Sequence, residues 1–490
     1  MAASDWQVII GLEVHAEMLT ETKMFSNCPV VDSVNAAPNT AVDPLSLGLP
    51  GTLPVINKKA MEYGMMVGLA LNCEIPPFNQ FARKNYFYPD LPKGYQISQY
   101  EYPLAVNGYL DIELEDGETK RIGITRAHME EDTGKLTHWG DSSLVDYNRA
   151  GVPLLEIVSE PDIRSSAEAE AYSRKLRTIL QFLGVNHGDM SKGVLRFEAN
   201  VSVMHKDDTE FRQRTEIKNL NSIRSMVRAI DVEVKRQIKL WEKGEAVKPA
   251  TLGWDEAAGK IIIQRYKERP DEYRYFPEPD LPIVEVSREW VAEVKAQLPE
   301  LPDVKRKRFI EELGLGDYDA GVLVADKAIA DYFEAVLTQA DGIDAKTVAN
   351  WMTGDMFRLL NEDRIDREDI ASTNIAPENF GAMIALVEDG TINAQTARKK
   401  VLPIMWEKGT DAQQIVDDEG LAQVSDAGII EEKVQEAMDA NPDMVEKYLD
   451  GNDKVINAIF GRTMGLLRGQ GDPGVVRKVL QEKLDALKDA

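Results

Sequence analysis

Acidic side chains and an imidazole are concentrated in residues 123–162. The hydrophobic pattern there predicts a strand, a polar loop and a second strand. Carboxylates packed this closely raise each other's pKa values, and a bound cation is the simplest way to hold them together. Mg²⁺ and Mn²⁺ prefer oxygen ligands with an occasional imidazole, which suggests phosphate chemistry. The charged residues of interest are His128, Glu130, Glu131, Asp132, Arg149, Glu156, Glu160 and Asp162.

Glu156 is the residue that argues against an ordinary solvated acidic loop. It lies within the apolar run PLLEIV. Burying a lone carboxylate costs several kcal/mol unless a positive group compensates it. A structured charged site therefore explains the stretch better than a solvated loop does.

A second imidazole and carboxylate pair lies in the strand predicted at residues 6–18. Its period-two pattern places Glu13, His15 and Glu17 on one face. A lone histidine on a strand is usually structural, but Glu-x-His beside a second acidic cluster favours a pair of metal ligands. The opposite, apolar face carries Trp6, Val8, Ile10, Leu12 and Val14.

Two later strands predict the surface on which this chemistry would lie. In residues 194–203 apolar side chains alternate with polar ones, and Glu216 and Lys218 share a face of residues 214–220. The pattern indicates a sheet with one face covered by helices and one charged face that forms the floor of an open cradle. The sequence has no Walker loop and no dinucleotide fingerprint, so a nucleotide would be held by metal, Arg and Lys on that floor.

The elements around the cradle are less regular. Residues 81–104 place Arg83, Lys84, Lys93 and several tyrosines among prolines, which is typical of a rigid loop over a substrate. A helix is expected after Ser165 or Ser166, either of which can cap it. Beyond residue 283 the pattern becomes that of successive short helices.

Length and composition limit the classes of protein that this chain can be. With 490 residues it needs several domains, and its two cysteines with no basic, apolar leader favour a reducing, cytoplasmic setting. No apolar run is long enough to span a bilayer. The net charge of −26 argues against a protein that coats nucleic acid nonspecifically. A local basic surface remains at the C-terminus, with Arg462, Arg468, Arg477 and Lys478.

Several long motifs carry a family resemblance. They include VIIGLEVHAEM, RKNYFYPDLPKGYQISQYE, ITRAHMEEDTGK, DYNRAGVPLLEIVSEPD, RFEANVSV, RTEIKNLNS and YRYFPEPDLP. In this order the motifs resemble those of the B subunits of aspartyl/glutamyl-tRNA amidotransferases, over essentially the whole chain. The resemblance implies an α+β fold with a glutamine-synthetase-like cradle of mainly antiparallel sheet (1–290), an all-helical domain (291–410) and a small helical tail (411–490) that binds transfer RNA.

The resemblance also implies a reaction and its partners. ATP would phosphorylate the side-chain carboxylate of Glu or Asp misacylated on tRNA(Gln) or tRNA(Asn), and ammonia would displace the phosphate to give the amide. Such a ligase would use ATP and Mg²⁺ and work in translation. Ammonia would come, through an internal channel, from glutamine hydrolysed by an amidase, the A subunit of the complex. A small C subunit would complete a heterotrimer.

By residue match, the metal ligands would be Glu13, His15, Glu130 and Glu156, with Glu130 and Glu156 also catalytic. Glu131 or Asp132 could replace Glu130, because neighbours on a strand point opposite ways. Arg196 and Lys84 are candidates for phosphate contact or for the ammonia entrance. Lys218 could bind the nucleotide, although for Lys218 and Arg149 a salt bridge to the cradle's carboxylates is at least as good an explanation. In the tail, Arg462, Arg468, Arg477 and Lys478 would contact nucleic acid.

One departure from the family pattern concerns zinc. Some members carry four cysteines after the first strand, where this chain has Ser26, Cys28, Asp43 and Ser46. One thiolate cannot make a tetrahedral zinc site, so we expect no zinc.

Two other interpretations fit part of the pattern. A non-catalytic RNA-binding scaffold would explain the tail, but not the buried Glu156 or the pair of Glu13 and His15. A metal-dependent hydrolase of small esters or amides would explain the carboxylates alone. Neither alternative requires ATP.

Overall fold

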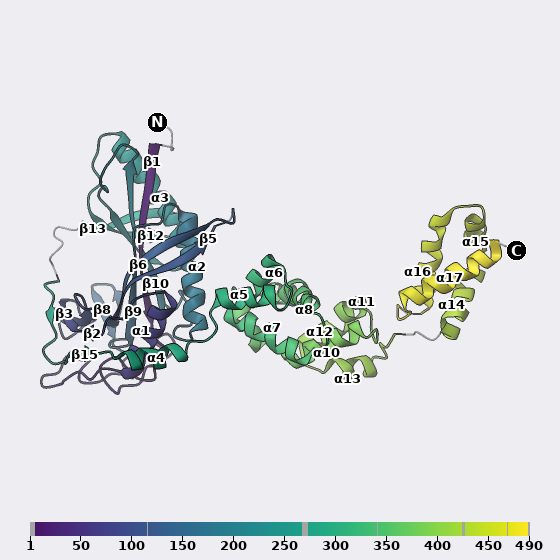
Figure 1. Ribbon diagram of the computed structural model, residues 1–490, viewed down its shortest axis with the longest axis horizontal. Coiled ribbons are helices and arrows are strands. Elements are labelled where there is room, and N and C mark those ends of the chain that lie inside the picture. Colours follow the sequence, from purple (N-terminus) through teal and green to yellow (C-terminus); the bar gives the residue numbers. More distant parts are fainter. Residues whose placement is uncertain are drawn as a thin grey trace. The chain divides into compact units, whose positions relative to one another are not determined.

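The protein divides into two compact units in a computed structural model, Met1–Pro302 and Asp303–Ala490. The structure describes residues 5–114, 116–266, 273–340, 342–423, 427–467 and 469–488. Figure 1 shows a first unit that contains the strands and a second that is built from helices. The predicted α+β fold, with a mainly antiparallel sheet before a helical region, is confirmed.

An eight-stranded sheet forms the frame of the first unit, in the order β13-β12-β11-β10-β1-β9-β6-β5. Every neighbouring pair is antiparallel except β11 and β12. The central position of β1 gives its side chains neighbours on both sides. The strands are β1 (Trp6–Glu17), β5 (Ala105–Glu113), β6 (Thr119–Glu131), β9 (Pro153–Ser159), β10 (Leu195–His205), β11 (Thr215–Leu220), β12 (Ala250–Asp255) and β13 (Lys260–Tyr266).

One face of this sheet is covered by helices. They are α1 (Lys58–Ala70), α2 (Ser166–Phe182) and α3 (Ile223–Glu242), which lie beside the sheet in Figure 1. Each begins at a polar cap, and Ser165 caps α2 through the backbone N–H of Glu168, as one of the two predicted options. The apolar face of β1 packs into the shared core with these helices. Core residues from these elements include Ile10, Leu12, Val14, Met65, Tyr172, Leu176, Met226 and Ile230.

Smaller sheets lie outside this frame. The segment predicted as a rigid loop contains two paired strands, β3 and β4, so that prediction was wrong for residues 81–85 and 95–99. The polar loop predicted within residues 123–162 is likewise a hairpin of β7 and β8. In both cases the prolines or polar residues mark only the turn and not the strands beside it. The pairings are β14 (Phe276–Pro277) with β3 (Phe81–Asn85) and β4 (Tyr95–Gln99), β15 (Val284–Glu285) with β2 (Phe78–Asn79), and β7 (Lys135–Trp139) with β8 (Ser142–Asp146).

Helices make up the rest of the chain. Helix α4 (Arg288–Ala296) still belongs to the core of the first unit through Val294. The second unit has two separate apolar cores. The first is formed by α5 (Pro302–Glu311), α6 (Asp317–Leu323), α7 (Lys327–Gln339), α8 (Ala345–Trp351), η2 (Met352–Met356), α9 (Phe357–Asp363), η3 (Arg367–Ser372), α10 (Pro377–Glu388), α11 (Ala394–Thr396), η4 (Ala397–Val401), α12 (Leu402–Lys408) and α13 (Ala412–Asp418).

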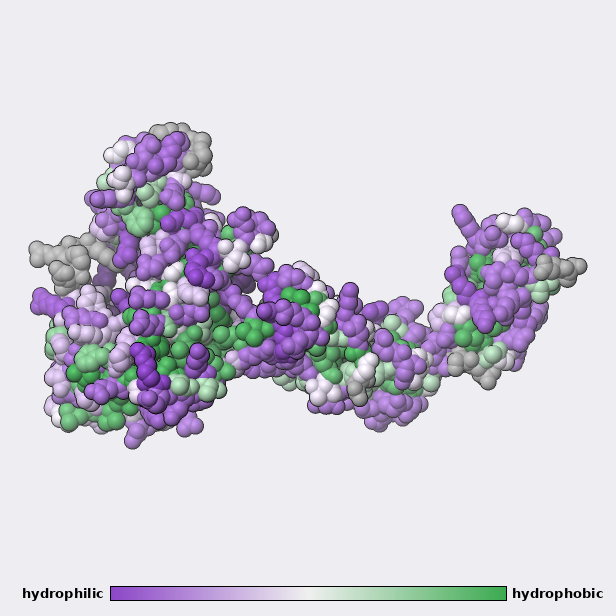
Figure 2. All heavy atoms as spheres, in the orientation of Figure 1, coloured by the Kyte–Doolittle hydropathy of each residue, from purple (hydrophilic) through white to green (hydrophobic). Residues whose placement is uncertain are grey.

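The last helices enclose the other core of the second unit, and their visible surface in Figure 2 is largely hydrophilic. Among the described residues, no helix combines the length and the apolar character that crossing a bilayer demands. The helices are α14 (Ala427–Asp439), α15 (Pro442–Leu449), η5 (Asp453–Val455), α16 (Ile456–Leu466) and α17 (Pro473–Lys488).

Candidate functional site

The charged face of β1 directs Glu13, His15 and Glu17 into three adjacent groups of charged side chains. Because side chains two residues apart on a strand lie roughly 6.7 Å from each other, each group is distinct but borders the next. We name the groups after their β1 residue. The His15 cluster contains His15, His128, Glu130 and Glu156; the Glu13 cluster contains Glu13, Glu198, Glu216 and Lys218; and the Glu17 cluster contains Glu17, Asp132, Arg149 and Arg196.

The His15 cluster is assembled by strand register. Glu156 on β9 lies opposite His15 on β1 and opposite His128 on β6. The Nε2 atom of His15 lies 3.2 Å from a Glu156 oxygen, and Nε2 of His128 lies 3.4 Å from a Glu130 oxygen. One donor atom each from His15, Glu130 and Glu156 lie within 4.8 Å of one another. The predicted ligands His15, Glu130 and Glu156 are therefore brought together.

The Glu130 carboxylate is held from the other side by the small sheet of β3 and β4. Ser98 Oγ donates to it at 2.7 Å and Gln96 Nε2 at 3.1 Å. Lys84 Nζ lies 3.7 Å from its Oε1 atom. Sequence reasoning named Lys84 but missed Gln96 and Ser98. Their alternation in YQISQ could have revealed a polar strand face.

Charge in the His15 cluster is balanced internally. Burial alone would lower the pKa of His15, but the hydrogen bond and negative charge of Glu156 raise it to about 8. Burial would raise the pKa of Glu130, but Lys84 and His128 outweigh it and lower that pKa. The pKa of Glu156 is also lowered, by His128 and His15 against burial. Both carboxylates thus favour their charged forms, and His15 must release a proton before its nitrogen can coordinate a metal ion.

This donor set fits a hard divalent cation. It offers two buried carboxylates and an imidazole, the combination that Mg²⁺ and Mn²⁺ accept. The Nδ1 atom of His15 is buried and has no hydrogen-bond partner among the described residues. A site with a polar atom left unsatisfied in this way has capacity for a further ligand.

The two neighbours of Glu130 are engaged elsewhere. The Glu131 carboxylate contacts Lys93 Nζ at 2.5 and 2.6 Å and accepts from the backbone N–H of Ile97 at 2.9 Å. Asp132 belongs to the Glu17 cluster. Of the three alternatives left open by the sequence, the structure brings Glu130 to His15.

In the Glu13 cluster a lysine lies among the carboxylates. Donor oxygens of Glu13, Glu198 and Glu216 lie within 4.8 Å of one another. Lys218 Nζ contacts Glu198 at 2.7 Å and Glu216 at 3.3 Å. Asn200 donates to Glu13 at 2.8 Å. Glu13 is thus placed apart from the other three predicted metal ligands, and Lys218 forms the salt bridges that were its alternative role.

The Glu17 cluster pairs carboxylates with arginines. Arg196 Nη1 lies 2.9 Å from Asp132 Oδ2 and 3.5 Å from Glu17 Oε1, and Arg149 Nε lies 3.6 Å from Asp132. Burial and the neighbouring Asp132 raise the pKa of Glu17 to about 8. Arg196 therefore lies one cluster away from the His15 donors.

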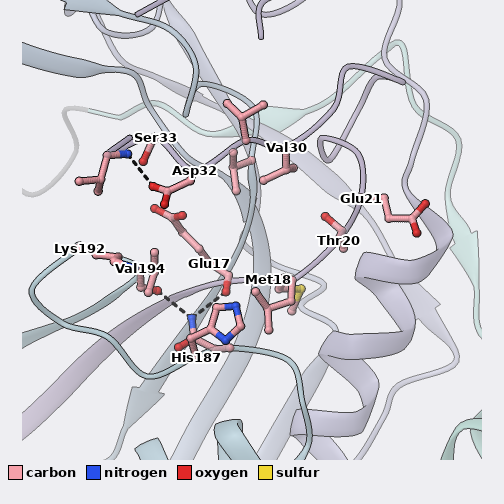
Figure 3. Close-up of a pocket in the computed structure, with 15 residues that line it drawn as sticks. Glu17, Met18, Thr20, Glu21, Val30, Asp32, Ser33, His187, Lys192 and Val194 are labelled. Carbon is pink, nitrogen blue, oxygen red and sulfur yellow. Dashed lines mark hydrogen bonds between the residues drawn. The ribbon is translucent and has the colours of Figure 1, made fainter. Parts of the chain in front are cut away.

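A cavity of about 410 Å³ opens beside the Glu17 cluster. Figure 3 shows Glu17, Asp32 and His187 among the side chains that line it, together with apolar residues such as Met18 and Val30. The cavity borders the Glu17 cluster rather than the predicted metal ligands.

Other predicted residues have structural partners or lie in the tail. Glu160 accepts from Thr125 at 2.7 Å, and Asp162 accepts from the backbone N–H of Gly123 at 2.9 Å. In the tail, Arg462, Arg477 and Lys478 are exposed on α16 and α17. Arg468 lies outside the described residues.

The four positions considered for zinc form a hydrogen-bonded group. Ser46 Oγ donates to Asp43 at 2.6 Å, and the backbone N–H of Cys28 donates to Ser26 Oγ at 3.3 Å. Lys23 is buried beside them, with its Nζ 2.7 Å from the Ala41 carbonyl oxygen. Burial raises the pKa of the Cys28 thiol.

Known protein families match both parts of the chain. The GatB/GatE catalytic domain matches residues 8–292, and the GatB domain matches residues 331–484. Among similar proteins, the B subunit of the aspartyl/glutamyl-tRNA(Asn/Gln) amidotransferase from Caldicellulosiruptor saccharolyticus is 48% identical over 485 residues, which is 99% of this chain and 100% of that protein. The proteins of the same name from Geobacter sulfurreducens (49% identity, 98% of this chain and 99% of that one) and Herpetosiphon aurantiacus (48%, 97% and 98%) are equally similar.

Proposed function

Since this chain belongs to the family of aspartyl/glutamyl-tRNA(Asn/Gln) amidotransferase B subunits, we propose that it is the component that converts misacylated Glu-tRNA(Gln), Asp-tRNA(Asn) or both into the amide. In the first step an oxygen of the amino acid's side-chain carboxylate attacks the γ-phosphorus of ATP, and ADP leaves. In the second, the lone pair of ammonia attacks the carbonyl carbon of this acyl phosphate, phosphate leaves, and the nitrogen loses one proton to give the amide. The proposed class is an ATP-dependent carbon–nitrogen ligase with glutamine as amido donor.

The observation that carries this proposal is the His15 cluster. His15, Glu130 and Glu156 would hold Mg²⁺, which when bound neutralises and orients the phosphates of ATP. Ser98 and Gln96 fix the Glu130 carboxylate by hydrogen bonds. Such second partners of a ligand are part of what makes a metal site precise.

Lys84 would supply positive charge at the edge of the cluster. Its ammonium lies near Glu130; burial lowers the pKa of Lys84, but the negative charges of Glu130 and Glu156 outweigh this effect and raise it. A lysine that stays charged at this position can contact a transferring phosphoryl group. Arg196 and Lys218 already form ion pairs with carboxylates of this chain. We therefore propose that they position the charged side chains of the Glu17 and Glu13 clusters.

The partners belong to the same proposal. Ammonia would be released from glutamine by an amidase, the A subunit, with a small C subunit completing the heterotrimer, and the complex would work in cytoplasmic translation. We assign glutamine hydrolysis to the amidase partner. The three clusters of this chain are built from carboxylates, imidazoles, guanidinium and ammonium groups, which suit the ATP-dependent step.

Replacing Glu156 by Gln in the assembled complex tests the proposal. The change keeps the shape of the side chain but removes a negative charge from the metal donors, so we expect amidation of Glu-tRNA(Gln) to fall 10²-fold or more. Glutamine hydrolysis should be much less affected. ATP turnover to ADP in the presence of misacylated tRNA measures the first step directly.

Added ammonium should not restore amidation by Glu156→Gln. A wild-type rate for this variant would show that the cluster is structural. ATP turnover that needs no misacylated tRNA would favour another reaction. Amidation without any ATP turnover by this chain would leave it as an RNA-binding scaffold.

We propose that the tail binds the body of the transfer RNA, because Arg462, Arg477 and Lys478 are exposed there. A deletion should begin after Gln423, because α13 packs in the core of the preceding helices. It should raise KM for misacylated tRNA about tenfold or more and leave glutamine hydrolysis intact. An unchanged KM would assign the tail another role.

For the group around Cys28 we propose a hydrogen-bonded structure without zinc. Cys28→Ser should change the free energy of unfolding by less than about 1 kcal/mol, because the thiol is only partly buried. Elemental analysis of the purified wild-type protein is the direct test. One zinc per chain would refute the proposal.

A further inference from the structure

Aromatic side chains line a small open cavity on the three-stranded sheet β14-β3-β4. This is the sheet that supplies Lys84, Gln96 and Ser98 to Glu130. The cavity measures about 90 Å³, too little to enclose a whole nucleotide but enough to seat one edge of a planar ring. Its aromatic residues are Phe81, Tyr100, Tyr102, Tyr275 and Phe276.

The cavity borders the face of the sheet that carries the Glu130 partners. β3 and β4 pair Lys84 with Gln96 and Ala82 with Ser98, so these four share one face, and Ala82 also lines the cavity. Tyr100 follows directly after β4. The rings of Tyr100 and Tyr275 stack with their centroids 4.3 Å apart and 9° between their planes. A series of contacts therefore leads from the stacked tyrosines through Tyr273 to Lys84, whose Nζ lies 5.0 Å from the Tyr273 ring centroid and 3.7 Å from Glu130.

Tyr275 interacts electrostatically with the same cluster. Burial raises the pKa of Tyr275 to about 12, an effect that Lys84 opposes and that Glu130 and Glu156 reinforce. The Tyr275 ring also packs edge-on against Tyr273, at 6.2 Å between centroids. Of the stacked pair, Tyr100 is 49% exposed, so its ring is the outer one.

The lining favours an uncharged aromatic ligand. Among the described residues that form this cavity, Glu101 is the only charged side chain, so nothing there neutralises a polyphosphate. A different cavity, next to Glu13, is lined by Arg212 and Arg214 together with Phe211 and suits a triphosphate better.

We propose that the aromatic cavity binds the 3′-terminal nucleoside of the aminoacylated transfer RNA, an inference that rests on the proposed function. The end of a transfer RNA is single-stranded, and exposed tyrosine rings are typical stacking platforms for such bases. With its base on Tyr100, the nucleoside would direct its ester-linked amino acid along the sheet face, past Tyr275 and Lys84, toward Glu130.

A crosslink to the assembled complex tests this placement without turnover. Transfer RNA carrying 8-azidoadenosine as its last nucleotide should label the peptide that contains Tyr100 and Tyr102, or the one that contains Tyr275. Excess unlabelled CCA trinucleotide should compete, whereas ATP at the same concentration should not. Labelling of the tail or of the cavity beside Glu13 instead would overturn the proposal while leaving the proposed amidation intact.

Substitutions give an independent kinetic test. Tyr100→Ala should raise KM for misacylated tRNA roughly tenfold, because it removes a stacking surface, with KM for ATP unchanged. Tyr100→Phe, which keeps the ring, should behave as wild type. Tyr266→Ala on β13, an equally exposed tyrosine at 54%, is the matched control and should change neither KM. A rise in KM for ATP with none for tRNA would assign the cavity to the nucleotide cofactor and overturn the proposal.

Discussion

The His15 cluster and the Glu13 cluster lie two residues apart on the same strand and contain the same kind of acidic side chain. In the Glu13 cluster, Lys218 contacts Glu198 and Glu216 directly, at 2.7 and 3.3 Å. In the His15 cluster the nearest lysine is 3.7 Å from Glu130, and neutral donors from β4 hold that carboxylate. The Glu13 cluster thus holds a lysine among its carboxylates, whereas the cation within the His15 cluster is the His15 imidazolium, which can become a metal ligand once it loses its proton.

Acidity alone therefore does not identify a metal site. Both clusters bring three donor groups within 4.8 Å. What separates them is how the charge is neutralised, because a lysine already bound among carboxylates competes with any metal ion. The comparison predicts different responses to matched substitutions.

The largest effect is expected when one carboxylate charge is removed from each cluster in turn. Glu130→Gln should slow amidation by 10²-fold or more, since it alters the metal donors. Glu216→Gln should cost less than about tenfold, because Lys218 keeps its stronger contact with Glu198. Rates and Mn²⁺ binding of the two complexes should be measured side by side. Equal losses would show that the two clusters act as one site.

A smaller effect is expected from removing the internal cation. Lys218→Met should lower the free energy of unfolding by about 2 kcal/mol, less than for a fully buried pair because the lysine is 35% exposed. Added Mn²⁺ should recover part of this loss by taking the place of the ammonium. Lys192→Met, which removes a more exposed lysine 3.8 Å from Asp189, serves as control and should shift stability by less than about 0.5 kcal/mol. If Mn²⁺ had no effect on Lys218→Met, the Glu13 cluster would have no latent capacity for metal.

The smallest effect concerns hydroxyls that hold a carboxylate in each cluster. Ser98→Ala removes a 2.7 Å hydrogen bond to Glu130 and should weaken Mn²⁺ binding about tenfold. Thr251→Val removes a 3.2 Å hydrogen bond to Glu216 and should leave Mn²⁺ binding unchanged. Both variants should be titrated with Mn²⁺ by the same method. If only Thr251→Val weakened Mn²⁺ binding, the metal would belong to the Glu13 cluster and not to the His15 cluster.

The alternation along β1 could be predicted from sequence, because a strand with one buried face has only one way to distribute its side chains. That pattern correctly separated Glu13, His15 and Glu17 from Ile10, Leu12 and Val14. The order of layers in the first unit followed from the same periodicity and from helix caps such as Ser165.

The composition of each cluster could not be predicted in the same way. Whether Glu130 or Glu131 faces His15 depends on the register between β6 and β9, which joins segments separated by the β7 and β8 hairpin. The contribution of Ser98 depends on a small sheet that packs over β6 from a segment with prolines at its turn. Such long-range pairings are set by tertiary packing rather than by local pattern.

The central position of β1 has a consequence for how this protein can change its length. The strand is paired along β10 from Trp6 to Ala16 and along β9 from Glu13 to Glu17. Inserting or deleting one residue in the middle of the strand would exchange the two faces on one side of the change, so that either Ile10 leaves the core or His15 turns into it. We therefore expect natural length variation to be confined to the hairpin tips and loops, and designed changes to this strand to succeed only in steps of two residues.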